Sequence, residues 1–195
     1  MSVIFGIKEY NCIIIAADKR GSNIDGRTIS DNLDKIIVIN EKLALSSAGN
    51  SAIDKAISLD ISKISNKEDL TTSDILDIIK NFYKRVIEAN CNSILALPYY
   101  FIIAGKGSDG NPSLISGGNI KGRIEAKEVP MVIYPPADTQ MQACCDFFAR
   151  NYKFDNKTFV EKTIKDISNI SNLVSPSGDK WIYSFQTQKG SIFSF

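Results

Sequence analysis

Short apolar runs and longer amphipathic segments alternate in blocks along the chain, and these blocks predict its strands and helices. Two apolar runs, Val3–Ile7 and Cys12–Asp18, are separated by Glu9–Asn11, which is the length of a hairpin turn. Two more runs, Lys35–Ile39 and Lys42–Ser47, follow a polar, Gly-punctuated stretch that is either a loop or a small hairpin. Four strands joined by short connections indicate an antiparallel sheet.

Apolar residues then recur at helical spacing in two pairs of segments. The first pair covers residues from about 50 to 89, and the second covers residues from about 139 to 170. Asn50 or Ser51 caps the first helix, and Thr71, Thr72 or Ser73 caps the second. The remaining predicted strands are Tyr99–Ala104, Ser113–Ser116, Arg123–Ala126, Trp181–Phe185 and Ser191–Phe195.

Separate blocks of strands and helices predict an α+β fold rather than alternating βαβ units. Two antiparallel sheets between two helical layers, a four-layer αββα sandwich, would accommodate these elements. No repeat, low-complexity tract or long linker divides the chain, so residues 1–195 are predicted to form a single domain. The 44% apolar and 23% charged residues are typical of a globular protein.

Charge and targeting signals narrow the classes of partner. The formal net charge of +1 gives no electrostatic reason to expect a nucleic acid or a membrane as a partner. The first residues lack the pattern of a signal peptide, and the apolar runs are shorter than a membrane span, so a cytoplasmic location is expected. The four cysteines lack CxxC spacing and are interpreted as structural thiols, and no metal or organic cofactor is expected.

The absence of histidine restricts the chemistry further. Without a His there is no Ser-His-Asp triad, no Cys-His dyad and no His-ligated metal. A catalytic base in this chain must therefore be a lysine, a carboxylate, a tyrosine or an α-amine.

Four motifs follow one another in the first fifty residues: Met1-Ser2-Val3, the AADKR element that contains Asp18, Lys35 at the start of a strand, and Ala48-Gly49 before the first helix. In this order they resemble the proteasome β-type subunits of the N-terminal-nucleophile hydrolase family, which includes bacterial proteasome-like peptidases. The match is strongest from Ser2 to about Ile57, and the later order of elements agrees over most of the chain.

The resemblance implies a role for each matching residue. Ser2 falls at the family's N-terminal threonine nucleophile, which requires removal of Met1, and a small second residue permits that removal. Asp18 and Lys35 match the acidic residue and the lysine beside the nucleophile. Gly49 matches the glycine whose N–H stabilises the oxyanion. Taken singly, the same residues are ordinary: a terminal serine, a turn-forming aspartate, a strand-flanking lysine and a helix-entry glycine.

The implied chemistry suits a chain without histidine. A free α-amine has a pKa near 8, so it can take the proton of the Ser2 hydroxyl near neutral pH. An ammonium at Lys35 would lower the pKa of that hydroxyl, and Asp18 would orient the lysine. Loss of an oxyanion donor such as the Gly49 N–H costs roughly 3–4 kcal/mol in other enzymes.

Two segments depart from the family pattern. A Gly-Ser-Gly turn of the family aligns with residues 132–137, where Pro135 stands and no serine or glycine occurs. Ser177-Gly178-Asp179 looks like the Ser-Gly before the penultimate strand, which makes Ser177 a further candidate site residue. The aspartate expected three residues earlier is replaced by Val174 or, with a shift, Leu173.

These observations leave two hypotheses. The first is an N-terminal-nucleophile amide hydrolase, a proteasome-like peptidase that acts on peptide or protein substrates through Ser2, with transpeptidation as a variant. The second is a catalytically silent proteasome-like subunit with a scaffold or assembly role.

The resemblance also implies a ring-like homo-oligomer. The apolar residues of segment 139–152 occupy more than one helical face, with Met141, Cys144, Cys145 and Phe148 directed inward. The excess apolar surface is buried either between subunits or within the monomer.

Overall fold

The computed structural model describes residues 2–23, 25–154 and 158–195, and it confirms a mixed α+β fold. The described residues form two five-stranded sheets, a two-stranded sheet and five helices. Every strand pairing among them is antiparallel. Two predictions concern residues outside the described ranges. One is the removal of Met1, which would make Ser2 the terminal residue, and the other is helix at residues 155–157, within the second predicted helix pair.

The first five-stranded sheet is built around the most apolar run of the chain. Its strand order is β10-β1-β2-β11-β12, and its strands are β1 (Ile4–Lys8), β2 (Cys12–Asp18), β10 (Met131–Tyr134), β11 (Gly178–Ser184) and β12 (Lys189–Ser194). The predicted hairpin of β1 and β2 is confirmed, with Ile4 opposite Ala17. Because β2 lies in the middle of the sheet, its apolar residues are buried on both faces.

The second five-stranded sheet is a meander. It follows chain order through β5 (Ile36–Asn40), β6 (Leu43–Gly49), β7 (Tyr99–Lys106), β8 (Pro112–Ile120) and β9 (Arg123–Glu128). A small hairpin of β3 (Gly21–Ser22) and β4 (Thr28–Ser30) forms in the polar stretch between β2 and β5. The strands at 99–106 and 112–120 are longer than the sequence predicts, because polar residues near their ends still pair.

The first two helices begin at predicted capping residues. Asn50 caps α1 (Ser51–Ser62), and Thr71 forms a capping box with Asp74 at the start of α2 (Thr72–Glu88). The second pair consists of α4 (Met141–Phe154) and α5 (Phe159–Ser168). A single turn, α3 (Asn92–Leu95), follows α2 and was not predicted.

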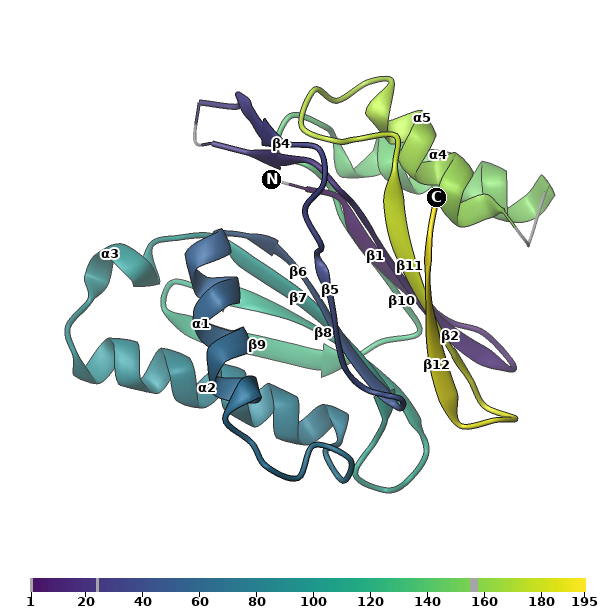
Figure 1. The fold of residues 1–195 in the computed structure, drawn as a ribbon. Helices are drawn as coiled ribbons and strands as arrows, with labels where there is room; N and C mark the ends of the chain where they lie inside the picture. Colours follow the sequence, from purple (N-terminus) through teal and green to yellow (C-terminus); the bar gives the residue numbers. More distant parts are fainter. Residues whose placement is uncertain (1, 24, 155–157) are drawn as a thin grey trace.

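Three clusters of buried side chains hold these elements together. One joins the first sheet to α4 and α5, and a second joins the second sheet to α1 and α2. The third contains side chains from both large sheets, including Ile4 and Trp181 from the first and Ile102 from the second. Figure 1 accordingly shows each helix pair running along its own sheet.

Two sequence expectations are corrected. Met141, predicted to face inward, is exposed because it is the first residue of α4 and lies beyond the buried positions Cys144 and Phe148. Residues 131–134 form the edge strand β10 beside β1, so the first half of the segment aligned with the family's turn is strand. That segment alternates too briefly to be recognised as a strand.

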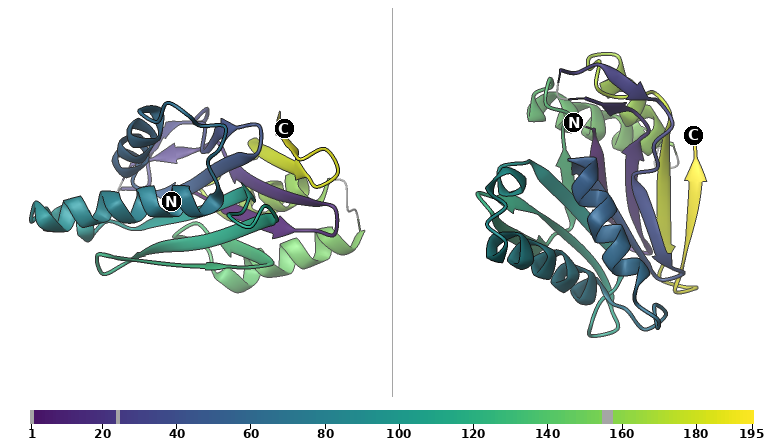
Figure 2. Two further views of the ribbon diagram at one scale, coloured as in Figure 1. Left: turned by 90° about the horizontal axis from the view of Figure 1, so that it is seen from below. Right: turned by 60° about the vertical axis from the view of Figure 1, so that its left-hand side comes forward.

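The ends of several strands meet at one end of the molecule. The start of β1, the end of β6 and the start of α1 lie together there in both Figure 1 and Figure 2. Asp18, the last residue of β2, pairs in register with Gly178, the first residue of β11. Separately, none of the described helices is long and apolar enough to cross a membrane.

We predict that Ile102→Ala lowers the free energy of unfolding by about 2–5 kcal/mol, because it leaves a cavity in the cluster shared by the two sheets. Ile120→Ala, at a half-exposed position on the neighbouring strand, is the matched control and costs less than about 1 kcal/mol. Urea unfolding of the two variants measures both values. Equal losses would contradict the assignment of Ile102 to a shared core.

Candidate active site

The carboxylate of Asp18 is the centre of the polar site at this end of the molecule. Asp18 is fully buried at the end of β2 and accepts four hydrogen bonds. The donors are the backbone N–H groups of Val3 (3.1 Å), Arg20 (2.8 Å) and Ser175 (3.1 Å) and the ammonium of Lys35 (2.9 Å). Burial of a carboxylate is tolerated when it is paired and hydrogen-bonded in this way.

Lys35 lies just before β5 and reaches across to the end of β2. Its Nζ donates to Asp18 Oδ1 at 2.9 Å and to the backbone oxygen of Arg20 at 2.6 Å. Only 10% of its side chain is exposed. Desolvation lowers the pKa of Lys35, although the charge of Asp18 acts in the opposite direction. Lys35 therefore loses its proton at a lower pH than a surface lysine does.

Ser2 joins the same group of atoms. Its Oγ donates to the backbone oxygen of Arg20 at 3.4 Å, so the hydroxyl of Ser2 and the ammonium of Lys35 share one acceptor. The next residue, Val3, is fixed by its own bond to Asp18. The structure therefore brings together three of the predicted residues, Ser2, Asp18 and Lys35.

Ser177 reaches this group through its neighbour Ser175. The two hydroxyls are 2.8 Å apart, and the Ser175 N–H donates to Asp18. The backbone oxygen of Ser177 also accepts from the N–H of Lys19 at 3.1 Å. Ser177 thus supports the loop that contacts Asp18, and its hydroxyl is hydrogen-bonded to Ser175.

Gly49 lies at the same end of the molecule, on the last position of β6. Two residues earlier, the N–H of Ser47 donates to the backbone oxygen of Lys35 at 3.3 Å. A Cβ at Gly49 would lie 2.2 Å from the Pro98 oxygen, and φ is +130°, so only glycine fits. Within the described residues, no hydrogen bond joins Gly49 to Ser2, Asp18 or Lys35.

The two departures from the family pattern, at Val174 and Pro135, each have a clear place in the structure. Val174 is buried in the cluster of α4 and α5, and no carboxylate stands there. Contact with Asp18 is made instead by the backbone N–H of Ser175. Tyr134, the last residue of β10, pairs with Ile4, so Pro135 follows beside the start of β1.

Sequence reasoning missed two backbone contributions and one polar pair. The Arg20 oxygen and the Ser175 N–H take part through main-chain atoms, for which residue type gives no signal. Arg20 is also anchored through its side chain, to Asp31 at 2.6 Å and to the backbone oxygen of Asn172 at 3.0 Å. The polar pair is Ser47 and Asp54, which are joined by a hydrogen bond of 2.5 Å between their side chains. The sequence signals this pair only through the polar residues on either side of Gly49.

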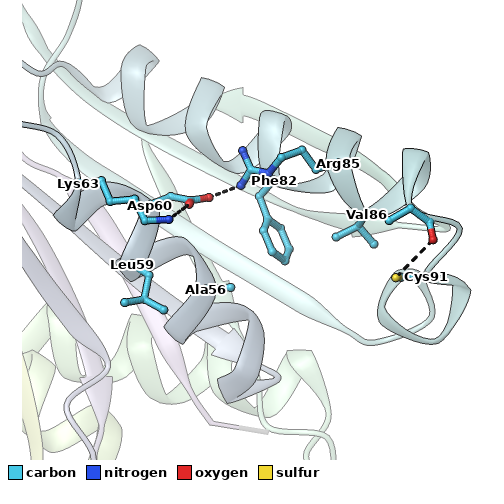
Figure 3. A pocket seen from close by; sticks show the side chains of 9 residues that line it. Ala56, Leu59, Asp60, Lys63, Phe82, Arg85, Val86 and Cys91 are labelled. Atoms are coloured by element: carbon cyan, nitrogen blue, oxygen red, sulfur yellow. Dashed lines mark hydrogen bonds and ion pairs between the residues drawn. The ribbon is translucent and has the colours of Figure 1, made fainter.

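A groove of about 320 Å³ lies elsewhere, on the helical side of the second sheet. It runs between α1 and α2, where Leu59, Phe82 and Val86 supply apolar lining and Asp60 pairs with Arg85 at the rim (Figure 3). None of the predicted site residues lines it. In the described part of the chain, no group of three or more Cys, Asp or Glu side chains is placed to hold a metal ion.

The site thus combines a hydroxyl, a buried ammonium and a buried carboxylate in a chain without histidine. Such a set can activate a hydroxyl for attack on a carbonyl, provided that a base takes its proton. Comparison with known proteins finds no family model that matches the chain and no curated protein with significant similarity to it.

We predict that Asp18→Ala lowers the free energy of unfolding by about 3–5 kcal/mol, since it leaves three N–H groups without an acceptor and the buried ammonium of Lys35 without its carboxylate. Lys35→Met should cost clearly less, because Asp18 keeps its three N–H donors. Chemical denaturation compares the two variants. A greater loss for Lys35→Met would show that Asp18 is not the organising group.

Proposed function

We propose that this protein is an N-terminal-nucleophile amide hydrolase, similar to a proteasome-like peptidase, that forms an acyl-enzyme through Ser2 after removal of Met1. One observation carries the proposal: Lys35 donates to Asp18, and Lys35 and Ser2 donate to the same backbone oxygen of Arg20. Asp18 and Lys35 are 17 residues apart in the sequence, yet their side chains are in contact. The resemblance of the motifs pointed to the same three residues independently of the structure.

The fold is compatible with this family. The shared cluster between the two large sheets, with a helix pair against each sheet, supports a four-layer αββα sandwich. In that architecture the nucleophile precedes β1 and the lysine precedes β5, as Ser2 and Lys35 do.

The proposed reaction begins with proton transfer from the Ser2 hydroxyl to the α-amine of the same residue. The oxygen then attacks the carbonyl carbon of the substrate amide, and the Gly49 N–H is the proposed donor to the resulting oxyanion. Collapse expels the amine half of the substrate, which receives the proton, and leaves an ester on Ser2. Water then releases the acid half, and an amine in place of water would give transpeptidation.

Lys35 acts on this reaction through its charge and its lowered pKa. In its ammonium form it lowers the pKa of the nearby hydroxyl and α-amine. Asp18 fixes the position of the ammonium, and Arg20 presents one backbone oxygen to both Lys35 and Ser2.

A catalytically silent subunit with a scaffold role is the second candidate. It is favoured by Val174, which is buried in the apolar core where the family has an aspartate, and by Pro135, which stands in place of a serine. For this candidate, Met1 stays attached and Lys35→Ala leaves biological function intact.

We predict that Ser2→Ala lowers hydrolysis of a mixed peptide library by roughly a thousandfold or more, because it removes the nucleophile. Ser108→Ala, in the exposed turn between β7 and β8, is the matched control and should retain the wild-type rate. Intact mass must show loss of Met1 in the active protein. Equal rates for Ser2→Ala and wild type, or a fully retained Met1, would contradict the hydrolase and favour the silent subunit.

A homo-oligomeric ring is part of the same proposal and rests on the resemblance. The apolar surface of α4 gives it little independent support, since Cys144 and Phe148 are buried within the monomer and Phe147 packs against the same cluster. The partner of the site is a peptide or protein, with neither nucleic acid nor membrane required.

We predict that light scattering at micromolar concentration gives a mass several times 21.5 kDa. The physical reason is that a peptidase of this kind protects other proteins by enclosing its nucleophile. A monomer at every concentration would contradict ring assembly.

A further inference from the structure

A second polar pair, Ser47 and Asp54, is linked to Lys35 through the main chain of Ser47. The Oγ of Ser47 donates a hydrogen bond of 2.5 Å to Oδ1 of Asp54, the range of a hydroxyl bound to a charged carboxylate. Ser47 is buried near the end of β6, and Asp54 belongs to the first turns of α1. The pair therefore links the second sheet to the helix that covers it.

Ser47 also connects this pair to Lys35. Its N–H donates to the backbone oxygen of Lys35 at 3.3 Å, so the residue that holds Asp54 also holds the main chain of the lysine. The charge of Asp54 raises the pKa of Lys35, and the charge of Lys35 lowers the pKa of Asp54. Each group therefore responds to the protonation state of the other.

We propose that Asp54 is a positioning residue for Lys35: it is a second carboxylate that holds Ser47, which in turn holds the main chain of the lysine, and its negative charge helps to keep Lys35 in the ammonium form that activates Ser2. This inference rests on the proposed function for its catalytic meaning. The electrostatic coupling of Asp54 to Lys35 is tested by titration of Lys35, which needs no measurement of activity.

The charged and titratable groups around the pair come from several elements. Asp18 on β2 and Arg20 after it face Lys35, with opposite effects on its pKa. Tyr83 on α2 and Tyr99 on β7 also interact with Asp54: burial is the main cause that raises the pKa of both phenols, and the charge of Asp54 adds to it. Both phenols keep their protons across the neutral range, so they do not change charge there.

The sign of the effect follows from these neighbours. Burial lowers the pKa of Lys35, and the two carboxylates oppose that change. When Asp54 is neutral, one opposing charge is lost and Lys35 gives up its proton at a lower pH. Burial itself raises the pKa of Asp54, which brings its own titration nearer to the working range.

The test is Asp54→Asn, which keeps the shape of the side chain and an oxygen for Ser47 but removes the charge. The pKa of Lys35 is read from the ¹³Cε signal of labelled lysine, assigned by its absence in Lys35→Met. We expect this pKa to fall by at least about half a unit, as for the loss of a nearby opposite charge. The alkaline limb of the pH profile of Ser2 acylation, where the ammonium of Lys35 is lost, should move to lower pH by the same amount, and Asp54→Glu should restore it.

Asp60→Asn is the matched control. It makes the same chemical change on the same helix, but Asp60 pairs with Lys63 and Arg85 at the groove of Figure 3. The pKa of Lys35 should not change in this variant. An unchanged pKa in Asp54→Asn, or an equal fall in both variants, would overturn the proposal.

A second variant keeps the proposal falsifiable if Asp54→Asn does not fold. The Ser47 hydroxyl lowers the pKa of Asp54, so Ser47→Ala should move an acidic inflection of the Lys35 signal to higher pH. An acidic inflection that stays in place overturns the coupling. If the pKa of Lys35 depends on Asp54 but Ser2 is never acylated, the proposed function is refuted and the coupling stands.

Discussion

The buried carboxylate of Asp18 is the interaction on which the site depends. It ends the central strand of the first sheet and holds three backbone N–H groups from separate segments, together with the ammonium of Lys35. A carboxylate without solvent requires all of these donors, because the cost of burying an unpaired charge exceeds the net stability of most domains. The N-terminal segment, the turn after β2 and the loop before β11 are therefore fixed relative to one another by one side chain.

The properties of Lys35 follow from a balance between desolvation and charge. Two carboxylates raise its pKa, yet the net change is downward, so desolvation is the larger effect. In a chain without histidine, the ammonium of Lys35 is the charge proposed to lower the pKa of the Ser2 hydroxyl. Asp54 and Ser47 extend the same balance into the second sheet and α1.

The sequence predicts the parts of the structure that depend on side-chain chemistry. The α+β class, the β1–β2 hairpin and the caps Asn50 and Thr71 follow from apolar period and turn residues, and the structure confirms them. The contact between Asp18 and Lys35 was suggested by the motif order, and the structure forms it. Main-chain groups such as the Arg20 oxygen and the Ser175 N–H were out of reach, because every residue carries them. The edge strand β10 was missed because its four residues are too few to show a period.

Covalent labelling by a peptide epoxyketone tests the central claim most directly, because a closed-ring adduct needs a hydroxyl and a free α-amine on one residue. The account predicts one adduct per chain, placed on Ser2 by tandem mass spectrometry and lost when Asp18 or Lys35 is replaced. An unlabelled protein that retains Met1, or an adduct found only on a cysteine such as the partly exposed Cys91, would contradict it.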